Sequence, residues 1–287
     1  RYAAANPRSA AHARDAARHW HRGVPFHWML DWGTPFPLFA DRAEGAELWD
    51  VDGHRYDDFC LGDTGSMFGH SPAPVAKAIR AQAPRGLTYM LPTEDALDAG
   101  RLLQEVFGPF RWQIATTATD ANRFAIRVAR AVTGRPKILV FNGCYHGTVD
   151  ETLVVADANG ETISRYGAIG PQVHPSLTTR VVPYNDLESL EKQLSFGDVA
   201  CMLIEPALTN IGIVLPEPDY LAGVRELTRK HGVILIVDET HTICAGPGGA
   251  TKLWDLEPDM LVIGKTIGVL ARGNILNRNF STGIVHD

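Results

Sequence analysis

One lysine has the surroundings that a reactive amine needs. Lys265 follows an apolar segment, Leu261 to Ile263, and a single glycine. Burial beside such a segment disfavours the ammonium form, lowers the pKa of the amine and makes it a usable nucleophile. A solvated lysine at the end of a strand is the alternative, and Lys265 alone does not decide between the two.

A carboxylate earlier in the chain has the same setting. Asp238 ends the apolar run Ile234 to Val237. A carboxylate in a low-dielectric site favours the protonated form of a nearby pyridine nitrogen, and a protonated ring is what allows pyridoxal phosphate (PLP) to act as an electron sink. An aspartate that caps a helix is the alternative. A strand-end Asp followed by a strand-end Gly-Lys is more specific than either alone.

Two polar turns supply the other candidate residues. The small and hydroxylated residues Thr116 to Asn122 precede a helical pattern, where backbone N–H groups and the helix dipole can hold a phosphate. Capping by Thr119 or Asp120 is the commoner meaning of this pattern. The turn from Asn142 to Gly147 follows a strand, and its Tyr145 can lie flat against a planar ring. A buried Tyr-His pair is the alternative for that turn.

The elements that position these residues alternate between strands and helices. Segments that are apolar apart from Lys137, which predict strands, cover residues 137–141, 199–204, 233–237 and 260–263. Such strands, separated by helices, are typical of a parallel sheet covered on both faces. Ligands bind at the carboxyl edge of such a sheet, so Glu205, Asp238 and Lys265 are expected to converge there. We therefore predict an α/β fold with a mostly parallel sheet.

One helix of this pattern has an apolar stripe. The residues expected on its buried face are Ala121, Ala125, Val128 and Val132. They recur at helical spacing, and Gly134 is expected to end the helix.

Composition and charge narrow the class of protein. The 287 residues are 45% hydrophobic and 21% charged, as in ordinary globular proteins. A net charge of −6 provides no basic surface for nucleic acid, and no apolar run approaches the length of a membrane helix. We expect neither partner, and a cytoplasmic location. The four scattered cysteines contain no CxxC pair and are expected to be free thiols.

The order of these motifs resembles the class III aminotransferases and, within that class, the glutamate-1-semialdehyde aminomutases and their relatives. The most specific motifs are the hairpin from Gly45 to Phe59, the turn from Gly143 to Gly147, and the spacing of Asp238 and Lys265. The resemblance implies the large domain of a homodimeric fold-type-I PLP enzyme. Such an enzyme transfers an amino group between an amine or amino acid and a carbonyl acceptor, both small molecules.

The resemblance also implies a set of site residues. The cofactor-binding residues would be Ala118 and Thr119 at the phosphate, Tyr145 stacked on the ring, His146 beside it, Glu205, Asp238 and Lys265. Two of them would be catalytic. Lys265 would hold the cofactor covalently and move protons, and Asp238 would bind the pyridine nitrogen.

Two departures from the family pattern concern the ligands. The phosphate turn has Thr-Ala-Thr-Asp-Ala at residues 117–121 where the family usually has Ser-Gly-Thr-Glu-Ala, a change that keeps donors and charge. The arginine with which the aminomutases clamp the substrate carboxylate would fall near Trp28. An aromatic ring cannot replace a guanidinium, which favours a bulkier or less polar amine over glutamate semialdehyde.

The end of the sequence is a third departure. Val269 to Asp287 resembles nothing in the family, so we expect a divergent tail, a missing small domain and a fragment that is not itself a competent catalyst. The expected division is an N-terminal segment with a β-hairpin at 1–60, a PLP-binding large domain at 61–268 and the tail at 269–287.

Other functions are open or disfavoured. A nicotinamide enzyme shares the sheet type, but no GxGxxG turn occurs. Cys144, His146 and His241 lack the spacing of metal ligands, so no metal is expected. An intramolecular aminomutase and a truncated, non-catalytic PLP-binding fragment stay open as alternatives, although the intact Lys265 and Asp238 favour catalysis.

Overall fold

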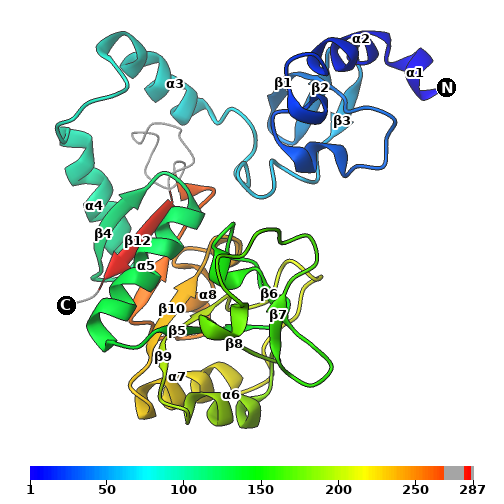
Figure 1. Ribbon diagram of the computed structural model, residues 1–287. Coiled ribbons are helices and arrows are strands. Elements are labelled where there is room, and N and C mark those ends of the chain that lie inside the picture. Colours follow the sequence, from blue (N-terminus) through cyan, green and yellow to red (C-terminus); the bar gives the residue numbers. More distant parts are fainter. Residues whose placement is uncertain (268–280, 286–287) are drawn as a thin grey trace. The chain divides into compact units, whose positions relative to one another are not determined.

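The computed structural model describes residues 1–267 and 281–285 and contains two compact units, Arg1–Lys77 and Ala78–Asp287 (Figure 1). The sequence-based boundaries after residues 60 and 268 stay a prediction. Most of the expected tail, Val269 to Asp287, lies outside the described residues. The described part of it forms a strand, β12 (Ser281–Val285), which pairs antiparallel with β4 (Arg111–Ala115).

The first unit combines short helices with an antiparallel sheet. Its elements are α1 (Tyr2–Ala5), α2 (Pro7–Ala16), η1 (His21–Gly23), η2 (His27–Leu30), β1 (Ala40–Glu44), β2 (Glu47–Asp50) and β3 (Arg55–Asp57). β2 and β3 form the hairpin expected from the sequence, and Gly53 in its turn has a φ of +91°. The Asp52 carboxylate accepts hydrogen bonds from the Arg8 and Ser9 N–H groups at 2.7 and 2.9 Å. The hairpin turn thereby caps the start of α2.

A five-stranded parallel sheet is the core of the second unit. Its strands, in spatial order, are β11 (Met260–Val262), β10 (Ile234–Asp238), β9 (Val199–Ile204), β5 (Lys137–Phe141) and β8 (Thr179–Val182). Each neighbouring pair is parallel. All six residues of β9 are buried, which is why this strand is apolar along its whole length. The predicted α/β fold with a mostly parallel sheet is confirmed.

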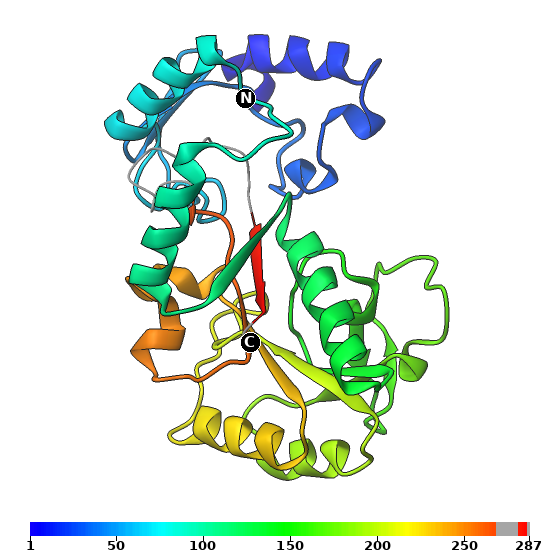
Figure 2. The same cartoon turned by 90° about the vertical axis from the view of Figure 1, so that its left-hand side faces the viewer.

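The other elements of the second unit are helices and short strands. They are α3 (Ala73–Gln82), which continues from the first unit, η3 (Ala83–Arg85), α4 (Glu94–Phe107), α5 (Ala118–Thr133), η4 (Asp150–Thr152), β6 (Val154–Ala156), β7 (Thr162–Ser164), η5 (Pro175–Leu177), α6 (Leu187–Leu194), α7 (Tyr220–Lys230), η6 (Thr242–Ala245) and α8 (Gly249–Leu253). α5 packs against β9, β10 and β11 (Figure 2), whereas α6 and α7 pack against each other and against β8 and β10.

The buried face of α5 differs from the predicted one. Val132 is 71% exposed, and the buried residues are Ala121, Asn122, Ala125, Ile126 and Ala129. The apolar periodicity was misleading because Asn122, a polar residue, occupies the buried face. Gly134 ends the helix in the left-handed conformation, as predicted.

Two further sequence expectations concern membrane helices and the cysteine thiols. Among the described residues, no helix has both the length and the apolar character that a membrane span requires. All four cysteines are free thiols, as predicted; Cys144 and Cys201 are buried, and Cys60 and Cys244 are exposed.

Candidate active site

The carboxyl edge of the parallel sheet collects the candidate residues. Asp238 is the last residue of β10, and Glu205 directly follows β9. Lys265 lies just past β11, whose Val262 pairs with Asp238. The fold therefore brings Glu205, Asp238 and Lys265 to the ends of three neighbouring strands, as predicted.

The Asp238 carboxylate is buried and hydrogen-bonded through both oxygens. Oδ2 accepts a hydrogen bond from Asn122 Nδ2 at 2.9 Å and lies 2.8 Å from His146 Nδ1. Oδ1 accepts hydrogen bonds from the N–H and the hydroxyl of Thr240 at 3.0 and 2.5 Å. Burial alone would raise the pKa of Asp238, but these bonds and the charge of His146 lower it below its ordinary value. The strand therefore ends in a stable anion.

His146 is the partner that fixes this charge. Its side chain is completely buried. Burial lowers the pKa of His146, whereas Cys144 and Asp238 raise it, and the result is a pKa well above the ordinary value. The observed contact of His146 is with the carboxylate of Asp238. Its direct contact with a cofactor stays a prediction.

Asn122 is a functional candidate that the sequence reasoning passed over. In the sequence it is only the last residue of the polar turn Thr116 to Asn122. Its Nδ2 donates to Asp238 and to the backbone carbonyl of His146, at 2.9 and 3.3 Å. An amide on the otherwise apolar face of a helix was the available signal, because a buried polar side chain needs a partner.

Glu205 holds the backbone of the aromatic turn. Its Oε1 accepts a hydrogen bond from the Tyr145 N–H at 2.9 Å, and its Oε2 accepts from the Thr209 hydroxyl at 2.7 Å. Glu205 is buried, whereas the Tyr145 side chain is 39% exposed. The carboxylate thus fixes the position of a ring that remains open to a ligand.

The polar turn before α5 has the geometry of an anion site. Thr117 is the N-cap, and its hydroxyl accepts a hydrogen bond from the Asp120 N–H at 3.0 Å. The sequence offered Thr119 or Asp120 as the capping residue, and the observed cap lies earlier, at Thr117. Ala118 and Thr119 then occupy the first turn, where helical N–H groups have no intrahelical acceptor and the dipole favours an anion.

A close approach joins the two turns. Thr119 Oγ1 accepts a hydrogen bond from the Thr148 N–H at 3.1 Å. Gly147 has a φ of +75°, and a Cβ at this position would lie 2.2 Å from Thr119 Oγ1. Only glycine fits there, because both the backbone conformation and the space exclude a side chain. The start of α5 and the Tyr145 turn therefore form one packed assembly.

Lys265 has an unusual backbone for a lysine. Its φ is +56°, in the left-handed region, and the next residue, Thr266, is buried. Such a conformation costs about 1–3 kcal/mol and persists where the surroundings enforce it, which is common at active sites. Other non-glycine residues, among them Arg22 and Asp255, have the same conformation, so the position of Lys265 at the sheet edge distinguishes it more than its backbone does.

Glu239 is a second buried carboxylate with a different environment. It accepts hydrogen bonds from the Thr242 hydroxyl at 2.6 Å, from the Ala250 N–H at 3.1 Å, and from the Thr251 N–H and hydroxyl. Burial raises the pKa of Glu239 despite these bonds. Its contacts connect β10 to η6 and α8, so it organises the loop beside the site.

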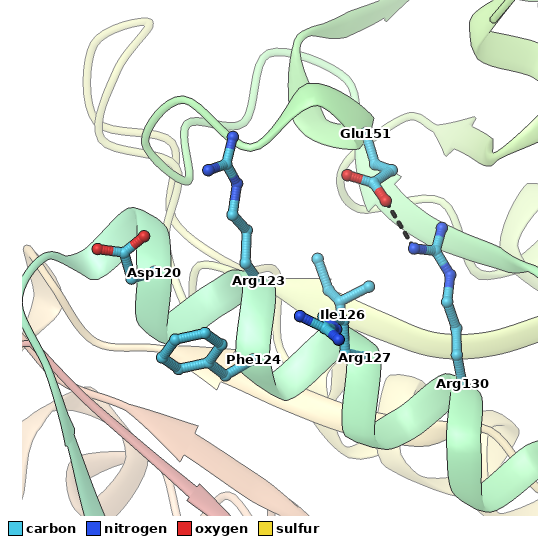
Figure 3. Close-up of a pocket in the computed structure, with 7 residues that line it drawn as sticks. All are labelled: Asp120, Arg123, Phe124, Ile126, Arg127, Arg130 and Glu151. Atoms are coloured by element: carbon cyan, nitrogen blue, oxygen red, sulfur yellow. Dashed lines mark hydrogen bonds and ion pairs between the residues drawn. The ribbon is translucent and has the colours of Figure 1, made fainter. Parts of the chain in front are cut away.

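A groove on the exposed side of α5 is a separate feature (Figure 3). It has a volume of about 460 Å³ and is lined by Asp120, Arg123, Phe124, Ile126, Arg127, Arg130 and Glu151. Arg130 pairs with Glu151 at 2.6 Å. None of the strand-end residues Glu205, Asp238 and Lys265 lines the groove, so it is not the candidate active site.

Comparisons with known proteins place this geometry in context. Residues 29–277 match the family described as aminotransferase class-III. A glutamate-1-semialdehyde 2,1-aminomutase of Chloroflexus aggregans is 39% identical over 236 residues, which cover 81% of this chain and 54% of that protein. The chain thus spans about half the length of the curated relatives that it matches.

Solved structures give the same answer for the fold. A glutamate-1-semialdehyde-aminomutase variant from Pseudomonas aeruginosa PAO1, in complex with PMP, superposes with a TM-score of 0.93 at 47% identity; the match covers 100% of this chain and 62% of that one. An omega-transaminase from Sphaerobacter thermophilus superposes with a TM-score of 0.88 at 28% identity, covering 97% and 64% of the two chains. The expected fold-type-I large domain is confirmed.

Proposed function

The chain belongs to the class-III aminotransferase family, and on that premise we propose that it holds PLP through Lys265 and transfers an amino group between an amine or amino acid and a carbonyl acceptor. The observation that carries the proposal is the buried Asp238 carboxylate. It lies at the same sheet edge as Lys265, with a lowered pKa and hydrogen bonds that fix its orientation.

The residues present fit a phosphorylated pyridine. The first turn of α5 offers N–H groups of Ala118 and Thr119 to a phosphate, and Gly147 keeps the space beside Thr119 free of a Cβ. The partly exposed ring of Tyr145 offers a stacking surface for the pyridine ring. Asp238 supplies a negative charge for the ring nitrogen. These groups suit one planar ligand with an anionic end and a cationic end.

Each side chain then has a defined task. When bound, PLP supplies an electron sink for the electrons released at the substrate α carbon. Asp238 keeps the ring nitrogen protonated, and His146 and Asn122 hold Asp238 in place and charged. Lys265 would hold the cofactor covalently at rest. Once the substrate amine takes its place, the freed Lys265 amine can move the proton at the substrate α carbon.

An intramolecular transfer is the second candidate. It is supported by the relatives named glutamate-1-semialdehyde aminomutase, the Pseudomonas protein among them. Trp28, near the position of the family's carboxylate-binding arginine, favours instead a transaminase with a bulkier amine or a β-amino acid as donor. Half-reaction rates with these donors and with the diamino partner of glutamate semialdehyde separate the two, because the aminomutase requires the diamino compound to react fastest. The homodimer implied by the family resemblance is a further proposal, which light scattering tests.

A titration with PLP tests the proposal. A covalently bound cofactor absorbs in the near-ultraviolet and visible range, whereas free protein does not, so we expect a new band that saturates with PLP. The Lys265→Ala variant should lack the band, and the Lys252→Ala variant, with its exposed lysine on α8, should keep it. A band of equal strength in Lys265→Ala would refute the assignment.

A further inference from the structure

Arg165 lies beside the open ring of the candidate site. Its guanidinium carbon is 5.9 Å from the centre of the Tyr145 ring, within the range of a cation–π contact. Tyr145 is partly exposed and Arg165 is half-buried, so a ligand over this turn can reach both. The position of Arg165 therefore matters for what the site binds.

Backbone contacts hold Arg165 in place. Its N–H donates to the Leu153 carbonyl at 2.9 Å, directly before β6. β6 is in turn tied to the aromatic turn, because the Ala156 N–H donates to Asn142 Oδ1 at 3.1 Å. These bonds connect Arg165 to the segment that carries Tyr145, so the arginine is a built part of the site and not a free surface side chain.

The charge of Arg165 is not neutralised by a carboxylate. Within residues 1–267 and 281–285, Arg165 has the ring contact with Tyr145 and no ion pair. A contrasting arginine on the same unit is Arg130, which pairs with Glu151 at 2.6 Å. A half-buried guanidinium beside a ligand site, with its N–H groups uncommitted to an acid, is suited to an anion brought by the ligand.

We propose that Arg165 binds the carboxylate of the substrate, and that the amino donor is therefore an amino acid and not a simple amine. The inference rests on the proposed function, whose substrate class it narrows. The guanidinium fork offers two parallel N–H groups to a carboxylate, a geometry that gives both affinity and orientation.

The location of Arg165 suits a carboxylate close to the reacting nitrogen. In the proposed function the cofactor ring lies on Tyr145, and the substrate nitrogen is next to that ring. The carboxylate carbon of an α- or β-amino acid is two or three bonds from its nitrogen, or about 2.5–4 Å at 1.5 Å per bond. The Arg165 guanidinium lies over the Tyr145 ring, 5.9 Å from its centre, and therefore at the ring on which the cofactor is proposed to stack.

This assignment also accounts for the departure near Trp28. The aminomutase-type arginine is missing from the N-terminal segment, yet a carboxylate partner is supplied by the loop after β7. Because this arginine comes from another segment than the family's arginine, the substrate carboxylate would lie in a different position relative to the reacting nitrogen. The chain therefore selects an amino acid without needing the arginine at the family position.

A paired-donor experiment tests the proposal. The donors are 3-aminobutanoate and 2-aminobutane, which differ by the carboxylate. With PLP-loaded protein, Arg165→Gln should raise the half-saturating concentration of 3-aminobutanoate about 10- to 100-fold and leave that of 2-aminobutane unchanged, because one charge-assisted pair is lost. Arg165→Lys should recover part of the loss. Arg14→Gln, an exposed arginine of the first unit, is the control and should change neither donor.

A second readout needs no turnover. Phenylglyoxal modifies accessible arginines, and peptide mapping gives the rate for each one. We expect 3-phenylpropionate to slow modification of Arg165 severalfold, 3-phenylpropanamide to have no effect, and Arg14 to respond to neither.

The outcomes are distinct. Equal loss with both donors would show that Arg165 only supports Tyr145, and no protection by the carboxylate would likewise overturn the proposal, in each case with the PLP band intact. Absence of the PLP band from the wild-type chain would instead refute the proposed function.

Discussion

The two edges of the parallel sheet use charge in opposite ways. At the amino edge, carboxylates meet arginines. Asp198, before β9, accepts hydrogen bonds from Arg180 Nε and Nη2, both at 2.7 Å. Asp259, before β11, accepts from the two Nη atoms of Arg225 at 2.7 and 2.8 Å. Each ion pair neutralises a carboxylate and joins two parts of the chain, so its role is structural.

At the carboxyl edge, the carboxylates Asp238 and Glu205 have partners of another kind. Asp238 is held by an amide, an imidazole and Thr240, and Glu205 is held by N–H and hydroxyl groups. Neither carboxylate forms an ion pair with a lysine or arginine in the described part of the chain. The comparison teaches that the amino edge pairs its carboxylates with guanidinium groups, whereas the carboxyl edge orients Asp238 through a buried imidazole, an amide and Thr240.

The largest effect is expected from Asp238→Asn. An amide cannot stabilise a protonated pyridine, so the amine half-reaction should slow by about 10²–10³-fold while the PLP band is retained. Because the surroundings of Asp238 are all donors, the variant also loses stability, and the rate is therefore expressed per bound cofactor. An unchanged rate would contradict the proposal that Asp238 stabilises the protonated pyridine.

A pair of glycines sharpens the comparison. Gly147 and Gly197 have φ values of +75° and +72°, but a Cβ would collide with Thr119 only at Gly147. Gly197→Ala, at the amino edge, should cost about 1–2 kcal/mol for the left-handed backbone. Gly147→Ala should cost about 1–3 kcal/mol more from overpacking and should weaken PLP binding. Urea unfolding measures the loss of stability, and PLP titration measures the loss of cofactor affinity. Equal losses of stability in the two variants would contradict the close packing of Gly147 against Thr119.

Asp198→Asn is the amino-edge counterpart of the first variant. It weakens two charge-assisted bonds to Arg180 and the ion pair with Lys137 at 3.4 Å. Since the pair is partly exposed, we expect a loss of about 1–3 kcal/mol in the free energy of unfolding. The PLP band should be unchanged once the protein is folded. A loss of the band in folded protein would mean that the two edges are not independent.

The smallest effect concerns pH. The folded pKa of His146 is raised above its ordinary value of 6.5, so its stabilising contribution is complete below pH 6.5 and is lost as pH rises through the folded pKa. Wild-type stability should therefore fall on the alkaline side, by at most about 1.4 kcal/mol per pH unit for one proton. His146→Asn, which keeps a donor but no charge, should show a shallower fall, whereas Asp198→Asn should keep the wild-type slope. Urea unfolding between pH 6 and 9 decides this.

The sequence predicted the strands that are buried along all or nearly all of their length. Residues 137–141 and 199–204 coincide with β5 and β9, because a strand buried on both faces must be apolar throughout. The edge strand β8 (Thr179–Val182) was missed, since Arg180 in it serves an ion pair and leaves only a short apolar run.

The sequence predicted the placement of the candidate residues that follow strand ends, and it did not predict the contacts between candidate residues. The placement of Asp238, Glu205 and Lys265 follows from a rule about parallel sheets. The contacts of Asn122 and His146 with Asp238 join positions far apart in the chain, which periodicity cannot reveal. The same is true of Arg165, which meets Tyr145 only through the folded hairpin β6–β7.

The central claim is that Lys265, at the carboxyl edge, carries the cofactor. Borohydride reduction of the PLP-loaded chain, followed by digestion and mass spectrometry, tests it most directly, because reduction makes the link permanent. We predict the pyridoxyl group on the peptide that contains Lys265. A pyridoxyl group on Lys137 or Lys252 instead would contradict the account.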